Sequence, residues 1–254
     1  MDPVLASLFD LSGKVALVTG GSRGLGREMV LAFARAGADV VVASRKLDHC
    51  IRVAAEVQAL GRRALAVSCH VGRWNEVDAL IEKAYREFGR VDILVNNAGM
   101  SPLYPSLEEV SEELYDKVLA VNLKGPFRLA TVIGARMARG AGGVIINVTS
   151  IAAERPTPME APYAAAKAGL NTLTVALARA FAPKVRVNAI EAGAFATDVS
   201  RHWDREAMGH FVKATVALQR IAEPREIVGT ALYLASEASS YTNGAIIRVD
   251  GGVR

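Results

Sequence analysis

Short runs of apolar, often β-branched residues recur along the chain and alternate with longer segments of helical periodicity. We expect seven strands: KVALVT (14–19), DVVVAS (39–44), RALAVS (63–68), VDILVN (91–96), GVIINVTS (143–150), KVRVNAIE (184–191) and AIIRVD (245–250). Most of these runs are apolar throughout, as in strands that are buried on both faces. Their alternation with helices predicts an α/β fold in which helices cover both faces of a parallel sheet.

The length and even composition of the chain favour a single domain over residues 1–254. A chain of 254 residues, 51% of them hydrophobic, can bury one substantial core. No repeat, low-complexity tract or linker interrupts the pattern. We expect an N-terminal arm over residues 1–10 and a substrate lid over residues 195–223, with bulk from Phe195, Trp203, Met208 and Phe211.

The charge balance and the cysteines argue against several classes of protein. The net charge of +4 comes from 30 basic and 26 acidic residues that are scattered along the chain, which disfavours nucleic acid as a partner. Cys50 and Cys69 offer neither a disulfide framework nor a metal cluster, so we expect a reducing, cytoplasmic compartment and no metal. We find neither a targeting segment nor the run of about 18 apolar residues that a membrane span needs.

A glycine-rich turn follows the first predicted strand. The segment TGGSRGLG, residues 19–26, lies between that strand and the helical segment REMVLAFARAG. A turn of this kind directs backbone N–H groups and the positive end of a helix dipole at one point, which suits a pyrophosphate. The spacing T-G-x-x-x-G-x-G differs from the general dinucleotide fingerprint, but it allows the same interaction of backbone N–H groups and a helix dipole with a pyrophosphate. A plain tight turn is the alternative.

The end of the second predicted strand indicates which nucleotide is bound. A dinucleotide fold places an acidic residue there when it binds the 2′-hydroxyl of NAD. This chain has Ser44, Arg45 and Lys46 at that point. Arg45, together with Arg23 of the glycine turn, suits a 2′-phosphate through charge-assisted hydrogen bonds. We therefore expect NADP(H) to be preferred, with NAD(H) possible; two solvated arginines are the alternative.

A tyrosine and a lysine stand four residues apart in YAAAK, residues 163–167, thirteen residues after Ser150. This spacing on a helix puts the Tyr163 phenol and the Lys167 ammonium on one face. A cation about 4 Å away at an effective dielectric near 20 contributes about 4 kcal/mol, and each pKa unit costs about 1.4 kcal/mol. We therefore expect Lys167 to lower the pKa of Tyr163 and to create a proton-transfer site. An ordinary amphipathic helix is the alternative.

With TGGSRGLG, NNAG at residues 96–99, Asn122, Ser150 and YAAAK in this order, the sequence resembles the short-chain dehydrogenase/reductase family, in particular its 3-oxoacyl-carrier-protein reductase-like members. The resemblance covers nearly the whole chain. It implies a single doubly wound Rossmann domain with a seven-stranded parallel sheet. It also implies that Tyr163 is the general acid/base, that Ser150 hydrogen-bonds the substrate oxygen, and that Lys167 holds the nicotinamide ribose. Asn122 would hold a water near the lysine.

The resemblance and the strand ends together predict a set of cofactor-binding residues. They are Thr19, Gly20, Ser22, Arg23, Gly24, Leu25 and Gly26 in the turn, Ser44, Arg45 and Lys46, His70 and Val71, Asn97, Ala98 and Gly99, Tyr163 and Lys167, and Gly193, Phe195 and Thr197.

Four positions depart from the family pattern or add to it. His70 stands where an aspartate commonly contacts adenine, and Ala192 replaces the proline of the PGxxxT motif. Glu191, beside Ala192, is unusual at a strand end; we favour its interpretation as a surface residue over a polar contact near the site. Pro126 lacks the N–H that the carbonyl of Asn122 would accept, so we expect the helix to kink there.

The resemblance implies a small-molecule carbonyl or alcohol substrate in a largely apolar pocket. Met100, Leu103 and Tyr104, the residues between Ser150 and Tyr163, and the lid would form it. Arg136, Arg139 and Lys184 are candidates for a basic rim that docks a carrier protein. The alternatives are an NAD(H)-dependent alcohol or sugar dehydrogenase, a dehydratase or epimerase, and a nucleotide-binding scaffold without turnover. A homotetramer or homodimer is expected, with the helices that end near Gly140 and Phe181 packed across a dimer face.

Overall fold

A computed structural model describes the chain except for residues 1–2, 198–208, 210–211 and 254. Its centre is one sheet of seven parallel strands in the order β3-β2-β1-β4-β5-β6-β7. The strands are β1 (Val15–Thr19), β2 (Asp39–Ser44), β3 (Ala64–Ser68), β4 (Ile93–Asn96), β5 (Gly143–Ser150), β6 (Val185–Ala192) and β7 (Ile246–Val249). The predicted α/β class and the doubly wound seven-stranded sheet are confirmed.

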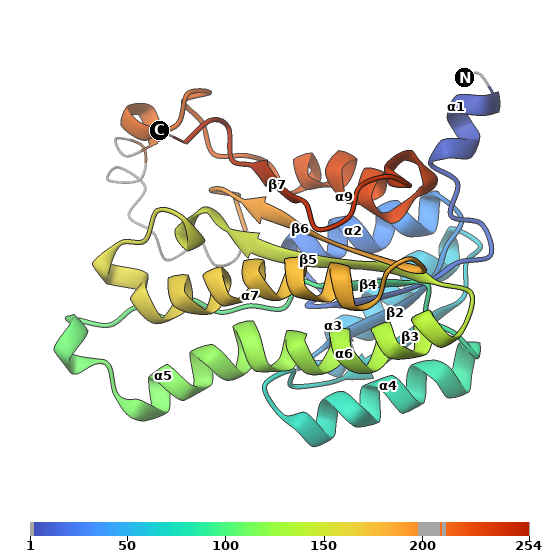
Figure 1. Ribbon diagram of the computed structural model, residues 1–254, viewed down its shortest axis with the longest axis horizontal. Coiled ribbons are helices and arrows are strands. Elements are labelled where there is room, and N and C mark those ends of the chain that lie inside the picture. The colour runs from blue at the N-terminus through green and yellow to red at the C-terminus, as the bar shows by residue number, and fades with distance from the viewer. Residues whose placement is uncertain (1–2, 198–208, 210–211, 254) are drawn as a thin grey trace.

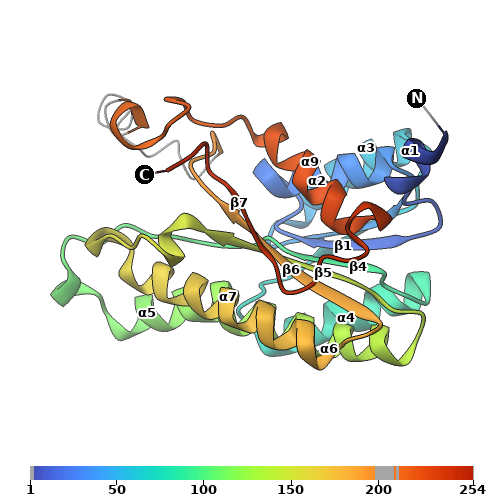
Figure 2. The ribbon, with the colours of Figure 1, turned by 45° about the horizontal axis from the view of Figure 1, so that its top comes forward.

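Helices cover both faces of the sheet (Figures 1 and 2). On one face lie α2 (Gly24–Arg35), α3 (Leu47–Ala59) and α9 (Val228–Ala235), and on the other α4 (Trp74–Phe88), α6 (Gly125–Arg139) and α7 (Ala161–Ala180). Helix α5 (Glu112–Leu119) contacts α7, and α1 (Pro3–Leu8) lies within the predicted arm. Each face has its own apolar core, one around Met29 and Phe33 and the other around Leu80 and Ile133.

The strand order reverses between β1 and β4, the two central neighbours. In open parallel sheets, ligands bind outside the carboxyl ends of the strands at such a switch point. Thr19 ends β1 and Asn96 ends β4, so the glycine turn and the NNAG segment meet at this edge. The topology therefore brings together motifs that lie far apart in the sequence.

Helices α5 and α6 form one helical run that contains a π-helical turn, Ala120–Lys124. Within it, the N–H of Gly125 donates to the carbonyl of Ala120, five residues earlier. Pro126 has no N–H to give to Asn122, so a regular α-helical ladder cannot continue here. A π-helical turn lies where the kink was predicted, and turns of this kind are frequent at functional sites.

The run Glu112–Arg139 is long and apolar enough to cross a membrane by length and composition alone. Half of its apolar 18-residue stretch is buried inside the protein, and the run packs against α4, α7 and the sheet. A core helix of a globular fold passes the same test, and the packing seen here is that of a core helix.

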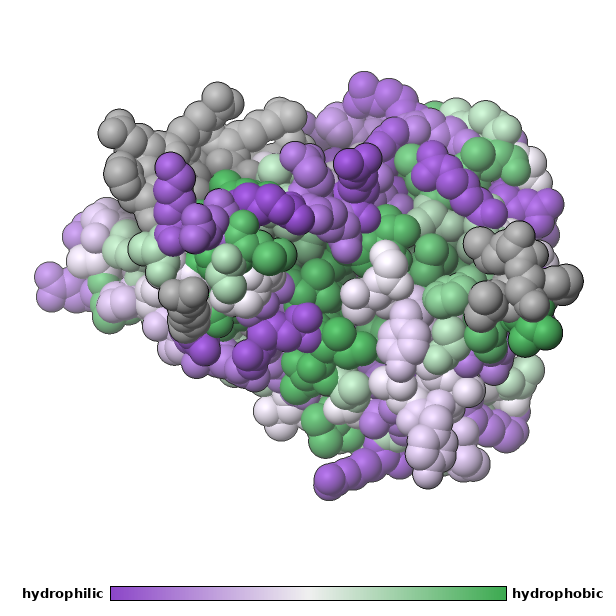
Figure 3. Space-filling view, turned by 90° about the horizontal axis from the view of Figure 1, so that it is seen from above, coloured by the Kyte–Doolittle hydropathy of each residue, from purple (hydrophilic) through white to green (hydrophobic). Residues whose placement is uncertain are grey.

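Edge strand β7 lies in the upper part of the molecule as Figure 1 shows it. Seen from above, this face has hydrophobic residues gathered near its middle with hydrophilic residues around them (Figure 3). Ile246 of β7 and Tyr241 before it are among the exposed large apolar side chains. An exposed edge strand with apolar residues is a surface on which another chain can pack.

Candidate active site

The glycine turn is held by short contacts between its backbone and the segment after β4. The Thr19 hydroxyl accepts hydrogen bonds from the N–H groups of Asn97 (3.1 Å) and Ala98 (3.2 Å), and the Asn97 side chain donates to the Thr19 carbonyl (2.9 Å). A Cβ on Gly20 would lie 2.7 Å from Asn97 Nδ2, and one on Gly26 would lie 2.3 Å from the Gly20 carbonyl oxygen. Only glycine fits at these two positions, so the backbone itself forms the cradle.

A group of small polar side chains lies where the 2′-phosphate is predicted to bind. Ser22 in the turn donates to Ser44 at the end of β2 (2.8 Å), and Ser44 Oγ lies 3.0 Å from Cys50 Sγ. Arg23 and Arg45 are both exposed beside these hydroxyls, as is Lys46. The structure therefore brings the residues predicted to bind a 2′-phosphate to one place. Leu25 is half-buried and packs against the core beneath α2.

His70 and Val71 follow β3, at the expected adenine end of the site. His70 Nδ1 accepts from the Gly72 N–H (3.2 Å), so the ring carries its proton on Nε2 when neutral. The His70 N–H donates to Glu76 (2.7 Å), and this bond is the largest cause of the lowered pKa of that carboxyl. Val71 is buried against the start of α6, where a Cβ on Gly125 would lie 2.1 Å from its carbonyl oxygen. An adenine contact from Val71 would therefore come from its backbone.

Ser150, Tyr163 and Lys167 converge where β5 ends and α7 begins. Ser150 is the last residue of β5, and α7 carries Tyr163 and Lys167 on successive turns. Lys167 is only 3% exposed, and its ammonium donates to the Val148 carbonyl (2.8 Å). The ammonium also lies 5.6 Å from the centroid of the Tyr163 ring. The two motifs predicted to share one site do share it.

The electrostatics of this group differ from the sequence prediction. Burial raises the pKa of Tyr163 to about 12, and the nearby Glu160 charge raises it too, whereas a hydrogen bond with Ser150 lowers it. Burial lowers the pKa of Lys167 to about 8. The predicted lowering of the phenol pKa by Lys167 is therefore wrong for this geometry. The reason is that burial outweighs the hydrogen bond, while the ammonium is directed at Val148.

Asn122 lies in the π-helical turn and is fully buried. Its amide donates to the carbonyls of Met100 (2.8 Å) and Val118 (2.9 Å), and its Oδ1 accepts from the Met100 N–H (3.2 Å). A Cβ on Gly99 would lie 3.0 Å from Asn122 Oδ1 and 3.6 Å from Lys167 Nζ. Asn122 thus clamps the loop after NNAG beside Lys167. Sequence reasoning gave no signal for this clamp.

The segment after β6 completes the edge of the site. The Gly193 N–H donates to Val249 (2.9 Å), and a Cβ on Gly193 would lie 2.6 Å from Asp250 Cα. Thr197 packs beside Gly24, where a Cβ would lie 3.5 Å from Thr197 Cγ2. Phe195 is buried in the core, so a cofactor contact from it would come from the backbone. Trp203, Met208 and Phe211 of the predicted lid lie outside the described residues.

Glu191 is 1% exposed, so its interpretation as a surface residue is wrong. Its carboxylate accepts from Asn171 of α7 (3.0 Å) and from Arg248 of β7 (3.2 Å). Arg248 also pairs with Glu154 in the loop after Ser150. A buried charge is tolerated when it is paired in this way, and the register of β6 with β7 places Arg248 directly opposite Glu191.

The substrate side is formed partly as expected. Leu103 is 71% exposed, whereas Tyr104 is buried and hydrogen-bonded rather than lining an open pocket. Glu160 is half-buried near the start of α7, and burial raises its pKa. Arg136 belongs to the predicted basic rim. It pairs with Glu82 and stacks on Tyr85, both on α4, so its side chain helps to pack α6 against α4.

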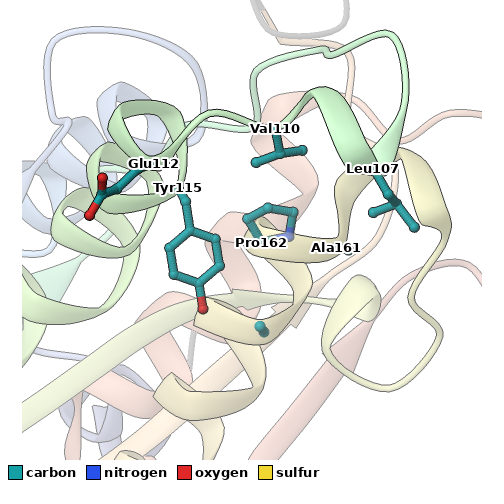
Figure 4. Close-up of a pocket in the computed structure, with 7 residues that line it drawn as sticks. Leu107, Val110, Glu112, Tyr115, Ala161 and Pro162 are labelled. Atoms are coloured by element: carbon teal, nitrogen blue, oxygen red, sulfur yellow. The ribbon is translucent and has the colours of Figure 1, made fainter.

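A pocket of about 550 Å³ lies between the first turns of α5 and α7, with Tyr115 and Pro162 on opposite sides of it (Figure 4). Leu107, Val110, Glu112, Ala161 and Ala165 complete its lining. Neither Ser150 nor Tyr163 lines it, so this pocket is separate from the chemical site. Within the described residues there is no cluster of three or more His, Cys, Asp or Glu side chains placed to hold a metal.

A doubly wound parallel sheet with a glycine turn at its switch point, and with serine, tyrosine and lysine side chains gathered at the next strand ends, defines a nucleotide-dependent oxidoreductase of the Rossmann class. A family model described as enoyl-(acyl carrier protein) reductase matches residues 20–254. The chain belongs to the short-chain dehydrogenase/reductase family.

Known proteins similar to this chain are dehydrogenases and reductases. The chain is 39% identical to dehydrogenase/reductase SDR family member 4 from Bos taurus over 244 residues, which cover 95% of this chain and 88% of that protein. Among solved structures, a 7α-hydroxysteroid dehydrogenase complexed with NADH and 7-oxo glycochenodeoxycholic acid is 33% identical, with a TM-score of 0.93 and coverage of 98% and 97%. An NADPH-dependent 3-quinuclidinone reductase from Rhodotorula rubra is 30% identical, with a TM-score of 0.93 and coverage of 99% and 95%.

Proposed function

We propose that this protein is an NADP(H)-dependent oxidoreductase that interconverts a ketone and a secondary alcohol, with Tyr163 as the general acid/base. The observation that carries this proposal is the meeting of Ser150, Tyr163 and the buried Lys167 at the carboxyl end of β5, beside Gly99 and Asn122. Among the relatives, one solved structure is named for NADPH and another for NADH, so the preference for NADP(H) rests on Arg23 and Arg45.

The residues of the predicted nucleotide site fit a dinucleotide. Gly20 and Gly26 leave no room for side chains, as required where a backbone must approach a pyrophosphate. Ser22, Ser44 and Arg45 would surround a 2′-phosphate, and Lys167 would bind the nicotinamide ribose. The bound cofactor supplies the hydride that reaches the carbonyl carbon, or accepts it in the reverse direction.

The side chains of this chain supply the proton and hold the substrate oxygen. In reduction, the Tyr163 phenol transfers its proton to the carbonyl oxygen, so that the carbonyl becomes a secondary alcohol. Ser150 hydrogen-bonds the same oxygen and fixes it within reach of the phenol. The phenolate then regains a proton from solvent before the next turnover. Exclusion of water by the buried surroundings strengthens these interactions.

The proposal is tested with purified protein, NADPH or NADH, and a panel of apolar ketones and secondary alcohols. We expect oxidation of NADPH by at least one ketone at a higher kcat/KM than with NADH. Tyr163→Phe should lower kcat by at least about 10²-fold, the lower range of general acid/base contributions, while the Kd for NADPH changes little. Tyr241→Phe, which alters a fully exposed tyrosine, serves as the matched control.

The alternatives give different outcomes in the same assays. A nucleotide-binding scaffold binds NADPH but turns over no member of the panel. An NAD(H)-dependent dehydrogenase reverses the cofactor ratio, and a dehydratase or epimerase forms product without net change in cofactor. Substantial turnover by Tyr163→Phe contradicts the assigned role of the phenol. A cytoplasmic location and a homo-oligomer remain part of the proposal.

A further inference from the structure

Tyr104 makes two hydrogen bonds that join separate walls of the site. It lies in the loop after NNAG and is 6% exposed. Its phenol donates to the Pro158 carbonyl (2.6 Å) and accepts from the Ala161 N–H (2.8 Å). Both capacities of the hydroxyl, one as a donor and one as an acceptor, are therefore used within the protein.

The start of α7 depends on such an external partner. The first N–H groups of a helix have no partner inside the helix. The side chain of Glu160, the residue before α7, makes no capping hydrogen bond. Pro162 has no N–H, and the N–H of Ala161 is satisfied by Tyr104 from a loop 57 residues away in sequence. Tyr104 thus performs the capping role that a serine or aspartate performs at many helices.

The capped turn is the one that carries the proposed acid. Tyr163 is two residues after Ala161, and the segment that holds Pro158 connects the Ser150 strand to this helix. The loop of Tyr104 is held at a second point, since Asn122 binds both the N–H and the carbonyl of Met100. The loop over residues 100–104 is thereby fastened to the π-helical turn at one end and to α7 at the other.

We propose that Tyr104 is a positioning residue for the proton transfer: its hydroxyl fixes the first turn of α7 and so holds the Tyr163 phenol against Ser150. This inference rests on the proposed function and extends it to a residue whose hydroxyl is hydrogen-bonded entirely within the protein. Tyr104→Phe keeps the ring in the core but removes both hydrogen bonds. The turn is then free to shift, and shifts of about 1 Å at a catalytic group cost up to about 100-fold in rate.

The test compares wild type, Tyr104→Phe and the control Tyr241→Phe in steady-state kinetics over the pH range of Tyr163 titration. For Tyr104→Phe we expect kcat for ketone reduction to fall at least about tenfold, with the Kd for NADPH within twofold of wild type. We also expect the pH profile limb assigned to Tyr163 to move to higher pH, because the hydrogen bond with Ser150 lowers the pKa of the phenol. Tyr241→Phe should behave as wild type.

Circular dichroism and the NADPH Kd establish that Tyr104→Phe is folded before its kinetics are interpreted. A lower Tm with unchanged kcat and an unmoved pH profile means that the hydroxyl only stabilises the fold, and this result overturns the inference. Absence of carbonyl turnover in wild type contradicts the proposed function instead. An active wild type with an equally active Tyr104→Phe contradicts only the role given to Tyr104.

Discussion

Lys167 is a buried cation, and its burial lowers the stability of the folded protein. Burial lowers its pKa from 10.5 to about 8, so the folded state disfavours its charged form. Because each pKa unit is worth about 1.4 kcal/mol, this corresponds to about 3 kcal/mol near neutral pH, partly offset by about 1 kcal/mol from the hydrogen bond to Val148. We predict that Lys167→Met raises the free energy of unfolding by about 2 kcal/mol near pH 7 and abolishes turnover.

The pH dependence identifies the cause of this gain. The unfolded chain keeps the Lys167 proton up to its ordinary pKa of 10.5, whereas the folded chain loses it near 8. Between these values the unfolded state binds more protons, so wild-type stability rises with pH relative to the variant. The advantage of Lys167→Met should therefore shrink between these pH values in urea denaturation, without cofactor. The exposed substitution Lys117→Met should show no such trend; a constant gap for Lys167→Met excludes ionisation as the cause.

Arg45 is the residue on which the cofactor preference depends. It is exposed beside Ser44 and Ser22, where a 2′-phosphate would accept its hydrogen bonds. Hydrogen bonds to charged groups are worth about 1.5 to 3 kcal/mol. We predict that Arg45→Asp lowers the ratio of kcat/KM for NADPH over NADH by about 10 to 100-fold, because the carboxylate repels a phosphate and accepts from a ribose hydroxyl.

The matched control for this exchange is Arg35→Asp, which changes the net charge equally. Arg35 is exposed at the end of α2 that lies away from the glycine turn. If the two variants change the cofactor ratio equally, the effect comes from overall charge rather than from a contact at Arg45. An unchanged ratio in Arg45→Asp contradicts the assignment of the 2′-phosphate site.

At the scale of elements, the sequence predicts the strands well because the strands are buried on both faces. The expected run 39–44 coincides with β2, and the run 143–150 coincides with β5. The ends of other strands differ by one or two residues, as with 245–250 against Ile246–Val249. Flanking residues such as Asp250 belong to the predicted run but do not pair with the neighbouring strand. The parallel order then follows from the helical crossovers, and the glycine turn and NNAG must meet at the switch point.

What the sequence could not give are the contacts that join elements far apart in the chain. Glu191 is charged at a strand end, and its burial depends on Asn171 from α7 and Arg248 from β7, neither of which is adjacent in sequence. Asn122 was identified by motif, whereas its clamp on Met100 required the fold. The spacing of Tyr163 and Lys167 in the sequence also does not show how deeply the two side chains are buried. Burial is the largest cause of the raised pKa of Tyr163. The missed features are therefore those set by tertiary packing.

For the whole molecule, two exposed apolar areas bear on assembly. One lies over α5 and α6, where Tyr115, which lines the pocket of Figure 4, and Phe127 are exposed. The other lies around edge strand β7, where Tyr241 and Ile246 are exposed. Scattered apolar residues are ordinary on a surface, but continuous patches mark interfaces. The expected dimer face includes α6, the helix that ends near Gly140 and carries Phe127.

We predict that the protein is a dimer or tetramer in solution and that Phe127→Glu shifts it toward the monomer. Phe127 is 39% exposed on α6, and a charge at the centre of an interface of about 800 Å² per partner would be buried without a counter-ion. Size-exclusion chromatography with light scattering over a range of concentrations measures the shift. Leu60→Glu, at a similarly exposed apolar residue after α3 on the opposite face of the sheet, is the control and should leave the assembly intact. A wild type that is monomeric throughout contradicts the predicted assembly. A Phe127→Glu variant that assembles as wild type does contradicts the α6 interface, because an interface centred on Phe127 cannot accept an unpaired charge.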